Sequence, residues 1–270
     1  MQNEEVFELE LIGGGMERRF RKMRPDVEQL PWGTLDPKDF PPALVLAART
    51  AWTRAAFQEH RTGIACALTL KVLMEARAPI DLIALATRFP LDELVHVELA
   101  ARMAMELGGG VPILHDPSHL VTRPREDLDP LLRAADLVVR FFCVGEALSI
   151  PMLRGSWHAT SHPLPKGILG TIVRDEAAHG AFGWTFLDWA LPDLEGDDLT
   201  LLADSADVTI AHLKRTWDDI RRRPKTEASD VHALGWMESD AYLELAAHSL
   251  ETRVLAPLRE RGIPAQSTAS

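Results

Sequence analysis

Two segments of the sequence carry the same pattern, Asp-Glu-x-x-His, and each pattern lies inside a long helical stretch. The first copy places Glu93 before His96, and the second places Glu176 before His179. Residues three apart in an α-helix lie on the same face, about one turn apart. Each copy therefore presents a carboxylate beside an imidazole. One copy arises often by chance, but two copies constrain the fold much more strongly.

Apolar residues recur at spacings of three and four along much of the chain, which predicts an all-α fold. The four main predicted helices cover residues 42–76, 80–107, 128–157 and 167–190. Pro42 suits the first turn of a helix, and Gly108 opens a three-glycine run that suits a helix end. Pro90 and Pro151 lie inside two of these stretches, so we expect a kink or a break at each.

The periodicity also divides the chain into parts. We expect an irregular N-terminal arm over residues 1–41, a four-helix domain over 42–190, C-terminal helices packed on its outside over 191–262, and a disordered tail over 263–270. The C-terminal helices are predicted near residues 197–222 and 236–261, with an exposed loop between them. The arm carries a basic stretch around Arg18 and Arg21, which we interpret as a solvated surface segment.

Charge and cysteine content argue against several functional classes. The chain has 29 basic and 40 acidic residues, a net charge of −11, so a nucleic-acid partner is not expected. The two cysteines, Cys66 and Cys143, form no CxxC pattern, which argues against a disulfide framework or a zinc ribbon. No apolar run is long enough to predict a membrane span, and no signal peptide pattern is present. We therefore expect a cytoplasmic protein.

The third predicted helix offers a carboxylate at the level of the second motif. In an antiparallel helix pair, residues at equal distances from the turn face one another. The turn lies near Ser161, and Glu176 follows it by 15 residues. The residue 15 positions before the turn is Glu146. Glu146 is therefore predicted to face Glu176.

The first predicted helix offers a carboxylate in the same way. The turn near residues 76–79 places the partner of Glu93 between positions 59 and 65, where Glu59 is the only acidic residue. Glu75 sits almost in the turn, roughly 25 Å along the axis from the level of Glu93 at 1.5 Å per residue, and is rejected. Four glutamates and two histidines form an oxygen-rich set that suits iron or manganese better than zinc.

On these residues the chain resembles the ferritin-like di-iron carboxylate superfamily, over residues 42–190. That family has Glu on the first and third helices and Glu-x-x-His on the second and fourth. The resemblance implies an antiparallel four-helix bundle that binds two Fe ions, with Mn or a mixed Fe/Mn pair as the alternative. The implied ligands are Glu59, Glu93, His96, Glu146, Glu176 and His179.

Departures from known subfamilies narrow the resemblance to an uncharacterised bacterial oxidase or oxygenase branch. Aryl-amine N-oxygenases carry an extra His four residues before the last Glu, where this chain has Ile172. The radical-generating subunit of ribonucleotide reductase needs a Tyr beside the metals, but Tyr242 lies in the last predicted helix. Rubrerythrins add a CxxC domain, which is absent, and storage ferritins lack the C-terminal helices.

Each motif is preceded by an aspartate, Asp92 or Asp175. An aspartate one position before the Glu is rotated about 100° around its helix and points toward the neighbouring helix. A metal-bound imidazole usually donates its other N–H to a carboxylate or carbonyl. We therefore expect a crossed pattern, in which Asp175 accepts from His96 and Asp92 accepts from His179, as the resemblance also implies. The alternative is that both are solvated helix residues.

Small residues also follow the predicted ligands. Gly63, Gly180 and Gly183 would either leave a cavity for dioxygen or substrate or allow close helix packing. Cys66 and Cys143 fit small core residues better than ligands.

The expected function is that of a non-haem di-iron oxidoreductase that activates dioxygen to oxidise a small organic substrate. Its partners would be that substrate, dioxygen and an external electron donor, and a homodimer is one oligomeric option. One alternative is a ferroxidase or peroxide scavenger without an organic substrate. Another is a purely structural helical protein.

Overall fold

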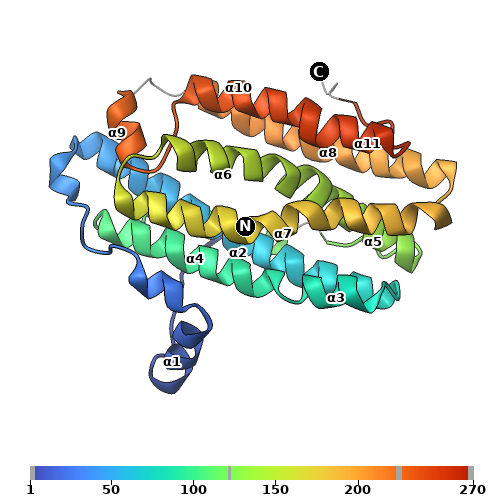
Figure 1. Cartoon of the computed structure of the whole chain (residues 1–270), viewed down its shortest axis with the longest axis horizontal. Coiled ribbons are helices and arrows are strands. Elements are labelled where there is room, and N and C mark those ends of the chain that lie inside the picture. Colours follow the sequence, from blue (N-terminus) through green and yellow to red (C-terminus); the bar gives the residue numbers. More distant parts are fainter. Residues whose placement is uncertain (1–3, 121–122, 223–226, 267–270) are drawn as a thin grey trace.

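The structure is a computed structural model that describes residues 4–120, 123–222 and 227–266, and this part of the chain is mostly helical (Figure 1). The long helices are α2 (Pro42–Glu75), α4 (Phe89–Glu106), α6 (Ala147–Ala159), α7 (Pro163–Ala190) and α8 (Gly196–Arg221). A two-stranded antiparallel pair joins β1 (Glu5–Val6) to β2 (Leu114–His115). The prediction of an all-α fold is confirmed.

Four helical rods form the body of the molecule. Three are α2, α4 and α7, and the fourth is a continuous run of α5 (Pro130–Val138), the π-helix η4 (Val139–Glu146) and α6. α2 packs on α4, α4 on α7, and α7 on both η4 and α6, while α5 packs back on α2. The rods therefore enclose a common interior, and in Figure 1 they run along the long axis of the molecule.

Prolines and glycines set the helix ends near the predicted positions. The predicted second helix is divided into α3 (Ile80–Ala86) and α4, with Pro90 in the first turn of α4, so the expected break is present. α4 ends before Gly108, whose φ of 103° is a left-handed conformation that suits glycine. α7 begins four residues earlier than predicted. Pro163 can occupy its first turn because the N–H groups there need no helical partner, and the His162 ring accepts the Leu164 N–H.

The C-terminal segments are α8, α9 (Ala228–Ala233), α10 (Ser239–Ser249), the π-helix η6 (Leu250–Leu255) and α11 (Ala256–Glu260), and several of them cover the outside of the fourth rod. α8 packs on α5 and η4, and α10 packs on α6. α9 lies where a loop was predicted, and the predicted tail begins too early because Ile263 and Ala265 are buried. Residues 223–226 of that loop and 267–270 of that tail lie outside the described residues.

The N-terminal arm is more ordered than the sequence predicted. It contains α1 (Gly14–Met23) and two short 3-10 helices, η1 (Pro25–Gln29) and η2 (Pro37–Asp39). Two further 3-10 turns are η3 (Pro117–His119) and η5 (Leu191–Asp193). The buried side chain of Arg24 pairs with Glu28 and with Glu98 of α4, which ties the arm to the body. The helical segments of the arm differ from the irregular structure expected there, and the Arg24–Glu98 pair joins residues far apart in the sequence.

The apolar interior divides into two clusters along the axis of the rods. One contains Cys66, Phe89, Phe142 and Phe182, and the other contains Trp52 and a set of buried aliphatic side chains. Glu59 on α2 and Glu176 on α7 lie between residues of the two clusters, whereas Glu146 is flanked by residues of the cluster that contains Phe142. None of the helices in the described parts of the chain is both long and apolar enough to cross a membrane.

Candidate metal centre

All six residues predicted as ligands lie together in the interior of the four rods. Glu59 comes from α2, Glu93 and His96 from α4, Glu146 from the last turn of η4, and Glu176 and His179 from α7. They form two sets of potential ligands, and within each set the ligand atoms lie within 4.8 Å of one another. These buried groups could hold a metal ion.

The two sets share two glutamates. One set is Glu59, Glu93, His96 and Glu176, and the other is Glu93, Glu146, Glu176 and His179. Glu93 and Glu176 therefore stand between the two imidazoles, and Glu59 and Glu146 lie at opposite ends. Two adjacent positions that share carboxylates are the arrangement found in di-metal carboxylate proteins built from helix bundles.

Both histidines point Nδ1 toward the shared carboxylates. His179 Nδ1 lies 3.1 Å from Glu93 Oε1 and 3.1 Å from Glu176 Oε2. His96 Nδ1 lies 3.3 Å from Glu176 Oε1 and 3.7 Å from Glu93 Oε2. Two ligands at right angles on one ion, each bonded at about 2.1 Å, would be about 3 Å apart. The donor atoms therefore already have a spacing that suits a common cation.

Several of these atoms are buried without a hydrogen-bond partner among the described residues. They include both carboxylate oxygens of Glu93, one oxygen of Glu176, and Nδ1 of His96 and His179. Buried polar atoms are nearly always satisfied, and a buried carboxylate is costly unless it is paired or bound to a metal. Converging acceptors of this kind fit a bound cation, so the residues present fit the metal that the resemblance implies.

The four carboxylates differ in their affinity for protons. Burial, reinforced by the negative charge of Glu93, raises the pKa of Glu59 well above its usual range. Burial, with Glu176 nearby, raises the pKa of Glu146 in the same way. At Glu176, burial is outweighed by the nearby imidazoles of His179 and His96, which lower its pKa to about 2. The shared glutamate Glu93 is lowered in pKa for the same reason.

The pKa values of both histidines are raised, in contrast to those of the two shared glutamates. Burial alone would lower the pKa of His179, but Asp92, Glu176 and Glu93 raise it to about 12. The pKa of His96 is likewise raised well above its usual value, because Asp175 and the shared glutamates outweigh burial. Without a metal, protons on the imidazoles therefore balance the shared carboxylates, and a cation must displace those protons to bind.

Each aspartate faces the histidine with which it was predicted to pair, but the predicted hydrogen bonds are not formed. His96 Nε2 faces Asp175 Oδ2 at 3.7 Å, and His179 Nε2 faces Asp92 Oδ2 at 3.6 Å. Both distances exceed the usual hydrogen-bond range, but each aspartate lies against the outer nitrogen of the imidazole on the other motif. Their side chains are only 10 % and 12 % exposed, so neither is an ordinary solvated helix residue.

Arg88 contacts the two crossed aspartates, and the sequence analysis did not identify it. Its Nε lies 3.0 Å from Asp92, and its Nη2 lies 3.8 Å from Asp175. One guanidinium therefore contacts both crossed aspartates from the solvent side. The position of Arg88 four residues before Asp92 is an i to i+4 pairing that sequence inspection could have identified.

An aromatic wall closes one side of the centre. The ring of Phe89 lies 4.2 Å from that of His179, and Phe142 and Phe182 pack against Phe89. These three phenylalanines are essentially inaccessible to solvent, so they exclude water from the His179 side. The apolar periodicity of each helix predicts that its phenylalanine is buried in the core, but it does not predict which residues the ring contacts.

The glycines beside the motifs serve close packing. A Cβ at Gly183 would lie 2.8 Å from Phe142 Cβ, and one at Gly180 would lie 2.6 Å from Ile150 Cδ1. A Cβ at Gly63 would lie 3.3 Å from Glu93 Cβ. Cys66 and Cys143 are buried free thiols within the apolar cluster, and burial raises the pKa of each.

Comparison with models of known protein families finds no match to this chain, and comparison with curated protein sequences finds none either. The geometry of the centre is therefore the basis for any assignment. Ile172, where a seventh ligand would lie, belongs to the second apolar cluster, and Tyr242 lies in α10, outside the four rods.

Proposed function

We propose that this protein is a ferritin-like, non-haem di-iron oxidoreductase that uses dioxygen to oxidise a small organic substrate. The observation that carries the proposal is the pair of ligand sets that share Glu93 and Glu176. Shared carboxylates allow two divalent cations to lie close together because their negative charge offsets the repulsion. Oxygen ligands with one imidazole at each position favour iron or manganese.

Each residue has a definite part in this proposal. Glu93 and Glu176, which belong to both ligand sets, would help to hold both metals, Glu59 and Glu146 would each help to hold one, and the imidazoles would offer Nδ1. A bound iron pair would supply the electrons and the open coordination positions that dioxygen requires. Asp92 and Asp175 face the outer nitrogens of the two imidazoles and would accept their N–H groups in the metal-bound protein, which would fix the tautomer in which Nδ1 is free to bind.

The remaining residues control access. The Phe89, Phe142 and Phe182 wall keeps the His179 side dry, which strengthens electrostatic interactions inside the centre. Glu59 keeps 18 % of its side chain exposed, so its side is the more accessible to water. An iron-oxidising or peroxide-scavenging protein would use the same ligands, and it differs only in needing no organic substrate.

The test is anaerobic loading with Fe²⁺, followed by metal analysis and then by admission of dioxygen. We expect about two metal ions per chain, as in other di-metal helix bundles, and rapid consumption of dioxygen. Parallel loading with Mn²⁺ compares the two metals. Consumption that depends on an added organic compound supports the oxidase, and consumption without one supports the ferroxidase or scavenger.

Glu75→Ala provides a matched control. Glu75 lies at the end of α2 and pairs with Lys71, away from the centre. This variant should bind metal and consume dioxygen as the unaltered protein does, whereas Glu176→Ala should lose both properties. Equal metal content in the two variants would contradict the proposal.

A further inference from the structure

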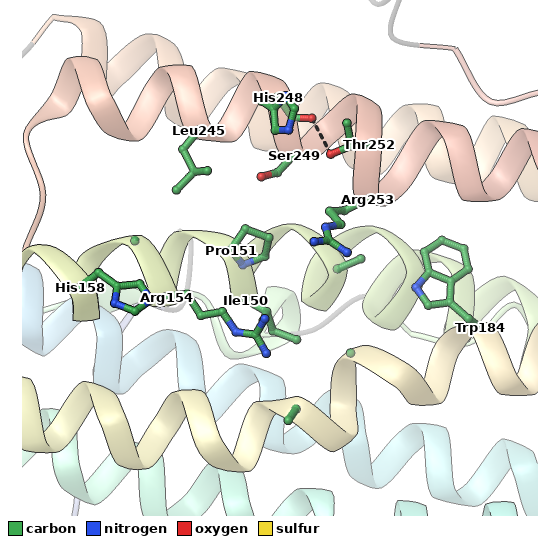
Figure 2. A pocket seen from close by; sticks show the side chains of 14 residues that line it. Ile150, Pro151, Arg154, His158, Trp184, Leu245, His248, Ser249, Thr252 and Arg253 are labelled. Atoms are coloured by element: carbon green, nitrogen blue, oxygen red, sulfur yellow. Dashed lines mark hydrogen bonds between the residues drawn. The ribbon is translucent and has the colours of Figure 1, made fainter.

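A cleft of about 690 Å³ lies between α6, α7 and the α10–η6 segment, outside the ligand cluster (Figure 2). This volume is in the range of small-molecule sites. Apolar side chains supply part of its surface, including Ile150, Trp184 and Leu245. Figure 2 shows Trp184 at one end of the cleft and Leu245 on the wall that α10 provides.

The charge of the cleft is opposite to that of the whole protein. Its lining contains Arg154, Arg253, His158 and His248 but no aspartate or glutamate. The chain as a whole has 40 acidic and 29 basic residues. A concave surface that carries arginines and, among the described residues that line it, no acidic side chain attracts anions, even on a protein with an excess of acids.

The two arginines come from opposite walls, and neither has an ion pair or side-chain hydrogen bond within the parts of the chain that the structure describes. In Figure 2, Arg253 extends from η6 toward α6, and Arg154 extends along α6 toward Ile150. Arg140 and Arg261, by contrast, have acidic partners in Asp136 and Asp188. The guanidinium groups of the cleft are therefore available to a ligand.

The floor of the cleft adjoins the ligand cluster. Ala147, Ala177 and Gly180 each follow a predicted ligand directly in sequence. Ile150 is one turn after Glu146, and its Cδ1 packs against Gly180. One layer of small and aliphatic side chains thus separates the cleft from the centre, so a molecule bound there would lie close to the proposed metals.

We infer that this cleft binds the organic substrate, and that the substrate is a small molecule with an apolar or aromatic body and an anionic group, a carboxylate or phosphate. Arg154 and Arg253 bind the anionic group, since guanidinium forms strong paired hydrogen bonds with both. Trp184, Ile150 and Leu245 contact the body. As an assignment of substrate class, this inference rests on the proposed function.

Two fluorescent probes of nearly the same shape separate charge from apolar contact. 1-Anilinonaphthalene-8-sulfonate is anionic, and N-phenyl-1-naphthylamine is its neutral counterpart. Arg154→Gln and Arg253→Gln should each weaken binding of the anionic probe about tenfold, the usual scale for a charged hydrogen bond. Binding of the neutral probe should not change. Arg54→Gln, an exposed position on α2, is the matched control and should alter neither.

Benzoate and phenyl phosphate test whether the cleft prefers a carboxylate or a phosphate, and benzoate also tests whether the bound molecule lies close to the metal centre. Each should displace the anionic probe, whereas benzamide should not. In protein loaded with Mn²⁺, the bound ion should broaden the proton NMR resonances of benzoate. A double variant that combines Arg154→Gln and Arg253→Gln should abolish this broadening.

Several outcomes would overturn the inference. They are an absence of probe binding, equal weakening of both probes, unchanged affinity in the double arginine variant, and absence of benzoate broadening in protein that holds Mn²⁺. Metal content is measured on every sample. Failure to bind metal counts against the proposed function, whereas failure to bind the anion with metal bound counts against this inference alone.

Discussion

The α2–α4 half and the η4–α7 half of the centre carry the same ligand types in different surroundings. Glu59, at the end of the first half, keeps 18 % of its side chain exposed and lies beside the accessible face. Glu146, at the end of the second half, accepts a hydrogen bond from Ser149 at 3.1 Å and adjoins the cationic cleft. Packing is tighter in the second half, where the backbone at Gly180 and Gly183 leaves no room for a Cβ.

This difference shows that repeated motifs need not form equivalent sites. The sequence repeat supplies the same donors, but the neighbouring helices decide which end meets solvent and which end meets a ligand cleft. Because Glu93 and Glu176 belong to both ligand sets, the two halves are coupled through them. The following predictions separate shared from local contributions.

The largest expected effect distinguishes shared from terminal ligands. Glu93→Ala removes a ligand common to both sets, so it should lose both metals in an elemental analysis. Glu59→Ala or Glu146→Ala removes a ligand from one set only, so each should lose about one metal from the two expected for such a site. A Glu59, Glu146 double alanine variant that keeps its full metal content would contradict the ligand assignment.

Metal affinity should rise steeply with pH. The pKa values of Glu59 and Glu146 are raised, so protons compete with the metal at both ends as the pH falls. The two histidines, also raised in pKa, must lose protons as well. Each displaced proton makes affinity change about tenfold per pH unit. Competition titrations with Mn²⁺ at several pH values measure the slope, and an affinity independent of pH would contradict the proton displacement.

The crossed aspartates should act on opposite halves. Asp175→Asn leaves His96 without its carboxylate and should weaken the metal on the Glu59 side, whereas Asp92→Asn should weaken the metal on the Glu146 side. A loss of about 10- to 100-fold in affinity is typical for such partners. Stepwise metal titration resolves the two positions, circular dichroism checks the fold, and Asp197→Asn on the exposed start of α8 is the control. Unchanged affinity in Asp175→Asn would refute this role.

The smallest expected effect is a change in the free energy of unfolding that comes from side-chain packing. Gly183→Ala would force a Cβ to within 2.8 Å of Phe142 Cβ and should destabilise the fold by about 1–3 kcal/mol. Gly63→Ala needs a shift of only a few tenths of an ångström, and the helix propensity gained, about 1 kcal/mol, offsets its cost. Denaturant unfolding compares the two. Equal stability of both variants would mean that the two halves are packed equally well.

The sequence predicted the ligand positions because regular helices run between each ligand and its turn. From Glu146 to the turn near Ser161 the chain follows α6, so counting residues gives the correct level. The same holds for Glu59 along α2. The resemblance and the counting therefore agreed on six residues that the structure brings into one cluster.

Tertiary contacts set the features that the sequence did not predict. The arm is held by Arg24, which reaches Glu98 across 74 residues of sequence. The cleft needs α10 and η6 to lie against α6 and α7, and no local pattern predicts which helix covers which. Arg88 could be seen as a partner of Asp92, but its contact with Asp175 depends on how α4 and α7 pack.

The π-helix η4 has a consequence for how this chain can change through mutation. A π segment accommodates an extra residue within an otherwise α-helical rod, and here it lies between Asp136 and Glu146. Asp136 faces outward to Ser205 of α8 at 2.7 Å, while Glu146 faces the interior. Because the π turn absorbs that residue, deletion of a single codon within residues 139–145 would restore α-helical winding and leave the two ends of the rod in the same orientation. The same deletion in a regular helix such as α2 would turn one end about 100° relative to the other. The rod that carries Asp136 and Glu146 can therefore lose one residue while both side chains still face their partners.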